Sequence, residues 1–172
     1  LVKPISAKKN HFVTGYVHKA YPPIYLKLAR NAGFDSSIVL RGTEGGIIPS
    51  LSQTSKAFYY KNTNEDDQIE QYNPKKDCGI DQSIRAVEIP KNASTTSAVD
   101  KIESKIEPLD IAKESVKQGM DALKGKDGPM KDCIIFGASI ILSKITGHDI
   151  NHSKNEIKKV LDSGSAVERM KI

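Results

Sequence analysis

Three elements predicted near the start of the chain constrain its fold more than any other feature. Residues 11–17 are rich in β-forming side chains, and a helix is predicted over 22–32, where Pro22 and Pro23 suit its first turn. Residues 36–41 form a short apolar run that indicates a buried strand. Two strands joined by a helix within about 30 residues are typically parallel, with a right-handed crossover. The segment therefore predicts an α/β fold with a parallel or mixed sheet and flanking helices.

The middle of the chain carries weaker strand signals. Residues 54–60 are β-prone, and residues 61–67 are polar and turn-like. Short runs at 68–72 and 85–89 are further candidate strands, and 91–97 is a polar linker. We therefore expect the remaining strands of the sheet to come from this region.

The last third of the chain predicts helices. Apolar residues at helical spacing indicate an amphipathic helix over 109–123. Residues 130–145 are apolar nearly all the way round, which indicates a helix buried on most sides. A last amphipathic helix follows, with Asn151, His152 or Ser153 as its N-cap.

Length and composition place the chain among globular proteins. Its 172 residues are the size of one ordinary domain, and we interpret residues 1–172 as a single α/β domain fragment, the C-terminal half of a longer protein. No run approaches the roughly 20 apolar residues of a membrane span, and no signal peptide is recognisable. We therefore expect a cytoplasmic protein without membrane contact. Both cysteines are expected to be reduced thiols, with Cys133 buried and Cys78 exposed.

Basic residues gather near the start of the chain. Residues 1–34 contain no acidic side chain, and the whole chain has a formal net charge of +5. A basic block attracts nucleic acid, an anionic membrane or a phosphorylated substrate. An ordinary solvated, lysine-rich surface is the alternative. The candidate contacts for an anion or a nucleic acid are Lys3, Lys8, Lys9, Lys19 and, from the next loop, Arg41.

A glycine-rich loop follows the second predicted strand. It lies where open α/β sheets place their ligand crevice, at the carboxyl end of a parallel strand. A phosphate cradle needs backbone N–H groups that open a helix, whereas Ile47, Ile48 and Pro49 follow here and Glu44 would repel an anion. A tight turn that requires glycine is the alternative interpretation. The candidate ligand-crevice loop consists of Gly42, Thr43, Glu44 and Gly45.

Two further groups of side chains could carry chemistry. His148 and His152 have the spacing of a zinc-binding helix, but the helix-end signals around them predict a loop, so we expect no metal site. Aromatic rings near the basic block could stack on bases, although rings beside a strand end also pack in a core. These rings belong to Tyr16, His18, Tyr21 and Tyr25. No nucleophile with its base and no carboxylate pair is recognisable, so no catalytic residue is assigned.

Several short motifs lie along the chain in a defined order. They are Thr14-Gly15-Tyr16-Val17-His18, Ala29-x-x-x-Gly33, Ile38-Val39-Leu40-Arg41-Gly42-Thr43-Glu44-Gly45, Gly125-x-x-Gly128-Pro129-x-Lys131-Asp132 and Asp162-Ser163-Gly164-Ser165-Ala166. In this order and spacing the sequence resembles the C-terminal half of anthranilate phosphoribosyltransferase and its relatives in glycosyltransferase family 3. The resemblance spans nearly the whole chain.

The resemblance implies a helical domain joined to the α/β domain, with Mg²⁺ and phosphoribosyl pyrophosphate held between them. Anthranilate would be the aromatic acceptor, in a reaction of tryptophan biosynthesis, and the pyrophosphate loop would lie upstream of this chain. In the family's enzymes the loop matching residues 42–48 ends in an Asp-Glu pair that helps to bind Mg²⁺, whereas here these positions are Ile47 and Ile48. Aliphatic side chains offer no oxygen ligand. We therefore expect Mg²⁺ only in a full-length parent protein, and no metal or other cofactor on this chain.

Two function classes follow from the resemblance. The first is a transferase of family 3, of which this chain is a C-terminal fragment that is inactive alone. Its partners would be phosphoribosyl pyrophosphate, an aromatic acceptor and the N-terminal helical half. The second is a non-catalytic relative, because the Arg-Gly-Thr-Glu-Gly form of the loop is similar to that of a branch that binds DNA or RNA. A third possibility is an unrelated α/β domain that packs or assembles, for example as a homodimer.

Overall fold

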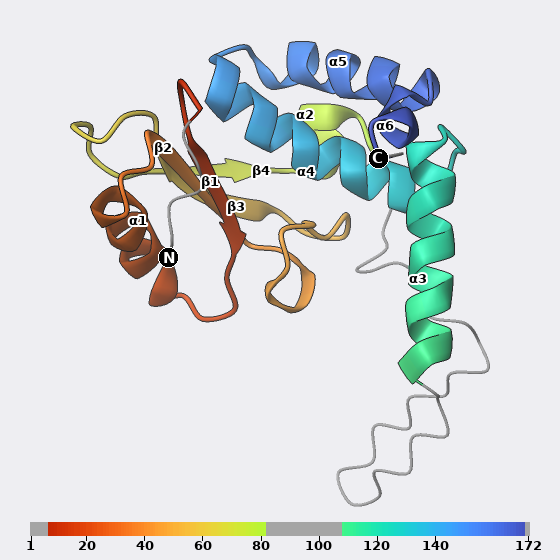
Figure 1. Ribbon diagram of the computed structural model, residues 1–172, viewed down its shortest axis with the longest axis horizontal. Coiled ribbons are helices and arrows are strands. Elements are labelled where there is room, and N and C mark those ends of the chain that lie inside the picture. The colour runs from red at the N-terminus through yellow and green to blue at the C-terminus, as the bar shows by residue number, and fades with distance from the viewer. Residues whose placement is uncertain (1–6, 82–107, 171–172) are drawn as a thin grey trace, which may run out of the picture.

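The computed structural model describes residues 7–81 and 108–170, and it contains a small sheet flanked by helices (Figure 1). The candidate strand at 85–89, the linker at 91–97 and Lys3 lie outside the described residues. In chain order the elements are β1 (His11–Gly15), α1 (Tyr21–Asn31), β2 (Ser36–Leu40), the 3-10 helix η1 (Thr43–Gly45), β3 (Ser55–Tyr60), β4 (Gln68–Tyr72), α2 (Pro74–Cys78), α3 (Pro108–Leu123), α4 (Pro129–Thr146), α5 (Ile150–Asp162) and α6 (Ser165–Glu168).

The strands of the described residues form one mixed sheet in the order β1-β2-β3-β4. β1 and β2 are parallel, with His11 opposite Ser36 and Gly15 opposite Leu40, and α1 connects them. β3 is antiparallel to both β2 and β4. The loop between β2 and β3 contains only η1, and a connection without a crossover helix returns the next strand antiparallel. The predicted parallel pair and the mixed α/β class are therefore confirmed.

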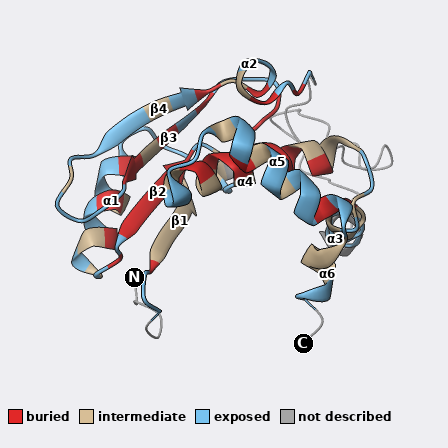
Figure 2. Ribbon diagram, turned by 90° about the horizontal axis from the view of Figure 1, so that it is seen from above, coloured by how far each residue is buried: buried red, intermediate tan, exposed pale blue. Residues whose placement is uncertain are grey.

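Alternate residues of β2 face two different helical layers. Ile38 and Leu40 belong to the cluster that contains α4, and Val39 belongs to the cluster that contains α1. β3 follows the same alternation, since Tyr59 joins the α4 cluster and Tyr60 joins the α1 cluster. Successive side chains of a strand point to opposite faces. β2 is therefore buried along its whole length and forms the centre of the fold (Figure 2).

α4 is the central helix of the core, as its apolar sequence predicts. Phe136 and Ile140 are fully buried, whereas Ile141 is only partly buried at the margin of the same cluster. Gly137 permits a close contact with the loop after η1, because a methyl group there would lie 2.9 Å from Cδ of Pro49. This contact anchors the loop that follows β2 against the core.

A buried lysine joins the ends of α3, α4 and α5. Nζ of Lys131 donates hydrogen bonds to the carbonyl oxygen of Gly125 at 2.9 Å, to Asp127 at 2.8 Å and to Asp162 at 2.5 Å. Hydrogen bonds to Asp127 and Asp162 raise the pKa of Lys131 by stabilising its charge. The sequence motifs at 125–132 and 162–166 thus meet at Lys131. From this point α3 extends away from the sheet (Figure 1).

The expectation that Cys78 is exposed is wrong, because this residue ends the short helix α2. Asn73 Oδ1 accepts a hydrogen bond from Lys76 N at 2.9 Å, and Asp77 Oδ2 accepts one from Asn73 N at 2.6 Å, which is a reciprocal cap. Cys78 is 3 % exposed, packs in the α4 cluster and has a thiol pKa that burial raises to about 11. Both Cys78 and Cys133 are buried free thiols.

α5 begins earlier than the sequence predicts. Its N-cap is Asp149, whose Oδ1 accepts hydrogen bonds from Asn151 N at 2.8 Å and from His152 N at 3.0 Å. The prediction of Asn151, His152 or Ser153 as the cap is therefore wrong, and all three residues lie inside the helix. This correction changes the surroundings of the two histidines that flank Asp149.

α4 spans 18 residues and α5 spans 13. Within residues 7–81 and 108–170, no single helix has both the length and the apolar character that crossing a membrane requires. α4 and α5 meet those criteria only as a pair, which is bent by 120°.

A carboxylate of β4 is held by donors from the sheet and from α4. Glu70 accepts hydrogen bonds from the hydroxyl groups of Tyr59 and Tyr72 and from Nζ of Lys144, the last at 2.6 Å. Partial burial opposes ionisation of Glu70, but these hydrogen bonds outweigh it and lower its pKa to about 2. Burial and the Glu70 carboxylate together raise the pKa of both tyrosines. The group ties β3 and β4 to the end of α4.

We expect the stability that Glu70 supplies to disappear in acid. Because its pKa falls from an ordinary 4.5 to about 2, its contribution is complete above about pH 4.5 and is lost as the pH falls toward 2. The side chain is 43 % exposed, and solvent screening limits the effect to about 1 kcal/mol. Urea denaturation should give wild type and Glu70→Gln different free energies of unfolding near neutral pH and converging values in acid. Asp66→Asn, an exposed control, should change the free energy of unfolding by no more than about 0.5 kcal/mol. A pH-independent effect of Glu70→Gln would contradict this account.

Candidate functional site

The parallel strands β1 and β2 end side by side and open a small cavity. Because Gly15 is in register with Leu40, Tyr16 and Arg41 leave the sheet together, and Tyr16 N donates a hydrogen bond to Leu40 O at 3.1 Å. The cavity has a volume of about 180 Å³, and we call it the carboxyl-edge cavity. It is lined by Tyr16, Val17, Arg41, Gly42, Thr43, Gly45, Ser50 and Gln53. This is the edge at which the sequence predicts a ligand crevice.

Glycines shape the loop that forms one wall of the cavity. A methyl group at Gly42 would lie 1.7 Å from the carbonyl oxygen of Gly46, and one at Gly15 would lie 2.2 Å from the carbonyl oxygens of Gly45 and Gly46. Gly45 has a φ of +82°, a left-handed conformation that favours glycine. The interpretation of this segment as a tight glycine turn is therefore confirmed.

A backbone hydrogen bond and a buried proline also hold this loop in place. Thr43 N donates a hydrogen bond to the carbonyl oxygen of Ile48 at 2.8 Å, which closes the turn. Pro49 is fully buried against α4, and the hydroxyl groups of Ser50 and Ser52 lie 2.9 Å apart. Because this backbone is already ordered, hydrogen-bond donors and cations on it would lose little conformational entropy when a ligand binds.

Arg41 is the cation of the cavity. Its side chain is exposed and forms no ion pair with an acidic side chain among the described residues. Tyr16, on the same wall, is 4 % exposed. Burial raises the pKa of the Tyr16 hydroxyl, and the positive charge of Arg41 opposes that rise. The guanidinium therefore lies near the buried phenol and still faces solvent.

Arg30 differs from Arg41 because its guanidinium is already paired within the protein. Its guanidinium pairs with Asp67 at 2.6 Å and donates hydrogen bonds to two carbonyl oxygens of the β3–β4 loop, at 3.3 and 2.6 Å. It also lies 4.1 Å from the centre of the Tyr60 ring. Arg30 ties α1 to that loop, so the basic excess near the start of the chain is not all available to a ligand.

The predicted anion contacts lie at two opposite edges of the sheet. Lys19 and Arg41 are exposed at the carboxyl edge, whereas Lys8 and Lys9 are exposed before β1 at the amino edge. A strand of five residues spans about 16 Å, so the two pairs cannot contact the same phosphate. The side chain of Glu44 lies outside the described part of the structure.

A larger cavity, of about 360 Å³, lies at the amino edge, but many of its polar groups are paired. Asp35 accepts a hydrogen bond from Asn10 N at 2.7 Å, and His11 Nδ1 lies 2.6 Å from the hydroxyl of Ser36. Lys144 is bound to the carboxylate of β4. The lining residues are Lys9, His11, Asp35, Ser36, Lys61, Asn62, Thr63, Lys144, Ile145, Thr146 and Gly147. We therefore place the candidate site at the carboxyl edge.

Three of the four aromatic rings form a row beside the carboxyl-edge cavity. The centres of the His18 and Tyr21 rings lie 5.4 Å apart, and those of Tyr21 and Tyr25 lie 5.9 Å apart. Tyr21 is 43 % exposed. Tyr16, by contrast, is buried in the α1 cluster, and Tyr25 is partly buried against it, so the packing interpretation holds for these two rings and leaves Tyr21 as the exposed tyrosine. The row of His18, Tyr21 and Tyr25, which we call the ring row, starts one residue after a residue that lines the cavity.

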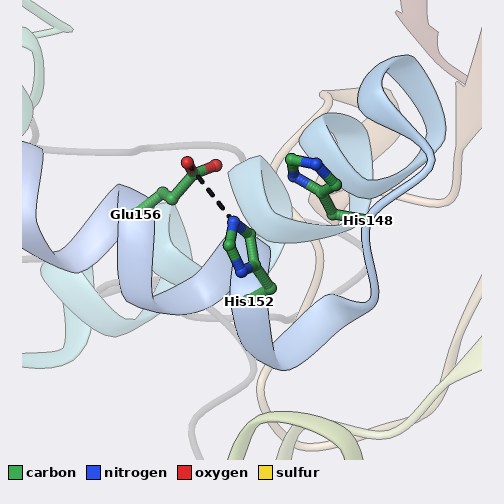
Figure 3. A group of neighbouring side chains, drawn as sticks. All are labelled: His148, His152 and Glu156. Carbon is green, nitrogen blue, oxygen red and sulfur yellow. Dashed lines mark ion pairs between the residues drawn. The ribbon is translucent and has the colours of Figure 1, made fainter.

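The structure also brings together a cluster that the sequence analysis rejects. His148, His152 and Glu156 place their ligand atoms within 4.8 Å of one another, which is compatible with a shared metal ion (Figure 3). The expected loop is confirmed at His148 and Asp149 but is wrong from residue 150 onward, because Asp149 caps α5 and places His152 and Glu156 on successive helical turns. The sequence signal for this cluster is a spacing of four residues that extends through Glu156.

Comparison with known proteins gives no assignment, since no protein-family model matches this sequence and no curated protein matches it significantly. Four of the five motifs that resemble the glycosyltransferase family nevertheless fall at two defined places, whereas the one at 29–33 lies at the end of α1. Those at 14–18 and 38–45 meet at the carboxyl-edge cavity. Those at 125–132 and 162–166 meet at Lys131, where they hold helices together.

Proposed function

We propose that this chain is a non-catalytic relative of anthranilate phosphoribosyltransferase that binds single-stranded DNA or RNA at the carboxyl edge of β1 and β2. The proposal rests above all on Arg41, which is exposed and lines the carboxyl-edge cavity beside a loop fixed by backbone contacts. Arginine binds phosphate through two parallel hydrogen bonds, and ligands of open α/β sheets bind at this edge. A backbone phosphate of a nucleic acid is the matching ligand.

The ring row supports a single strand rather than a duplex as the ligand. An exposed ring such as Tyr21 can stack on an unpaired base, a contact that contributes about 1–3 kcal/mol per base and tolerates any base. Lys19 lies between His18 and Tyr21 in sequence and supplies a further cation at the same edge. Cations and rings along one edge are the elements of a sequence-tolerant single-strand site.

The transferase alternative is weakened by Ile47 and Ile48. Both side chains are exposed, at 46 % and 40 %, and neither offers the oxygen ligands that the resemblance implies for Mg²⁺. Phosphoribosyl transfer depends on holding phosphoribosyl pyrophosphate and an aromatic acceptor together, and the family's residues for both would lie upstream of this chain. We expect no loss of anthranilate fluorescence when the chain is incubated with phosphoribosyl pyrophosphate and Mg²⁺. Turnover by this chain would favour the transferase.

A cytoplasmic location is part of the same proposal. Nucleic acids and reduced thiols share that compartment, and the two cysteines are buried and not joined to each other. A homodimer would double the number of carboxyl edges available to one strand and would raise avidity without new contacts.

Fluorescence anisotropy with a short labelled single strand, measured over a range of salt concentrations, tests the proposal. Log affinity should fall linearly with log salt, and Arg41→Gln should reduce the slope by about 0.7 for one lost phosphate contact. Tyr21→Ser should instead weaken binding about tenfold at every salt concentration with an unchanged slope, because stacking releases no counterions.

Lys8→Gln is the matched control for charge. Lys8 lies at the amino edge and should not alter binding at the carboxyl edge beyond a small long-range effect that salt screens. Loss of affinity in Lys8→Gln equal to that in Arg41→Gln would contradict the assignment of the site. Unchanged slopes in both variants would contradict the proposal as a whole.

A further inference from the structure

Three side chains gather around the start of α5, far in sequence from the carboxyl edge. His148 lies in the turn after α4, and His152 and Glu156 follow at intervals of four residues (Figure 3). Residues four apart lie on the same side of a helix, one turn above another. The turn and the first two turns of α5 therefore present two imidazoles and a carboxylate together.

The distances suit a shared ion. The His148 and His152 rings have centres 4.4 Å apart, and Nε2 of His152 lies 3.5 Å from Oε1 of Glu156. One ligand atom from each residue lies within 4.8 Å of the others. Ligands of a tetrahedral zinc ion, each about 2.1 Å from the metal, lie roughly 3.4 Å apart. Only small side-chain rotations separate the three groups from that arrangement, and all three are exposed and free to make them.

The backbone beneath these side chains is fixed. Gly147 N donates a hydrogen bond to Ser143 O at 3.0 Å, and His148 N donates one to the hydroxyl of Thr146 at 3.3 Å. Asp149 caps α5 through His152 N and is thereby occupied. The spacing of the three ligand-bearing residues is therefore set before any ion arrives, and binding has to order only their side chains.

We propose that His148, His152 and Glu156 form a surface site for a divalent transition metal, with Zn²⁺ as the reference ion. Two imidazole nitrogens and one carboxylate oxygen are ligands that zinc accepts, whereas Mg²⁺ and Ca²⁺ require oxygen ligands throughout. Three protein ligands leave a fourth position for water or for a group from another molecule. This site is independent of the nucleic-acid proposal and of the Mg²⁺ expected for a parent transferase.

The other two histidines supply internal controls. The chain has four histidines, and His11 is engaged with the hydroxyl of Ser36 at 2.6 Å, while His18 belongs to the ring row. A chain without a histidine tag therefore has one place where two imidazoles can bind the same ion. His18→Gln removes an exposed imidazole and leaves that place intact.

Competition of the chain with a chromophoric zinc indicator tests the proposal. One equivalent of Zn²⁺ should bind, and excess Mg²⁺ should not displace it. His152→Gln should lower the zinc affinity more than tenfold, because loss of a residue that only hydrogen-bonds a metal ligand already costs about tenfold or more. Glu156→Gln should lower the affinity less, and His18→Gln should leave it within about twofold.

Histidine ring resonances in NMR spectra provide the second readout, which does not depend on the folding of a variant. Zn²⁺ should shift the ring signals of His148 and His152 together and leave those of His11 and His18 in place. Equal zinc affinity in wild type and in His152→Gln would overturn the proposal. So would shifts at all four histidines, or at none, when one equivalent of Zn²⁺ is present.

Discussion

Gly42→Ala is expected to disrupt the carboxyl-edge cavity and to lower the free energy of unfolding by about 3 kcal/mol, the upper end of the usual effect of overpacking. The added methyl group would lie 1.7 Å from the carbonyl oxygen of Gly46 and 2.4 Å from its carbonyl carbon. These are backbone atoms, so no side chain can rotate away to relieve the clash. Oligonucleotide binding should fall together with stability, because the loop that carries Arg41 must shift.

Two glycines serve as controls for this variant. Gly46→Ala places a methyl group 3.3 Å from the carbonyl oxygen of Thr43, a much smaller conflict in the same loop. Gly119 lies in α3 with no atom within 4 Å of an added methyl group, so Gly119→Ala should stabilise the helix by up to about 1 kcal/mol. Urea denaturation of the three variants separates a local clash from a general effect of losing glycine. Wild-type stability and binding in Gly42→Ala would contradict the structure of the loop.

Ile140→Asp is expected to lower the free energy of unfolding by more than about 4 kcal/mol. Ile140 is fully buried between α4 and the sheet, and a carboxylate there would lose its water without gaining a partner. A thermal melt should show loss of the cooperative transition or a large fall in the melting temperature. If this variant yields no folded protein, Ile140→Val gives the graded value, a loss of about 1 kcal/mol.

Ile145→Asp is the matched control on the same helix. Ile145 is 37 % exposed near the end of α4, where a new carboxylate stays in contact with water. Its effect should be below about 1 kcal/mol. Equal destabilisation by the two aspartates, or a melt unchanged by Ile140→Asp, would contradict the place of α4 at the centre of the core.

The elements that the sequence predicts well are those with a strong apolar pattern. β2 is a short apolar run because both of its faces are covered, and α4 is apolar nearly all round because it packs between the sheet and α5. Both patterns come directly from burial, which is why the parallel pair and the core helix are recognisable without a structure.

The elements that the sequence analysis misses are held by caps and not by apolar patterns. α2 has five residues, too few for a helical period, and rests on the reciprocal cap of Asn73 and Asp77. Pro74 and Gly79 mark its two ends, so a search for cap residues could have found this helix, although the burial of Cys78 comes from its packing in the α4 cluster. The same rule applied to Asp149 would have placed His152 on a helix.

The candidate site is only partly recognisable from sequence. The position of the glycine loop follows from a general property of α/β sheets. The separation of the basic residues into two groups cannot be predicted in this way. Lys9 and Lys19 are close in sequence, but β1 carries the chain between them from one edge of the sheet to the other. The pairing of Arg30 with Asp67 cannot be predicted from the sequence either, because these residues are far apart in the chain. Such partners depend on the register of the sheet and the course of its loops.

An NMR titration of the ¹⁵N-labelled chain with a short single-stranded oligonucleotide can locate the binding surface residue by residue, because each backbone amide reports separately. We expect the strongest shifts at residues 16–19 and 41–46, at the carboxyl edge, and we expect Arg41→Gln to reduce them. Residues 61–63 and 144–147, which line the amino-edge cavity, should change little. Shifts confined to the amino-edge cavity, or a spectrum unchanged by saturating oligonucleotide at low salt, would contradict the claim that this chain binds nucleic acid at the carboxyl edge of β1 and β2.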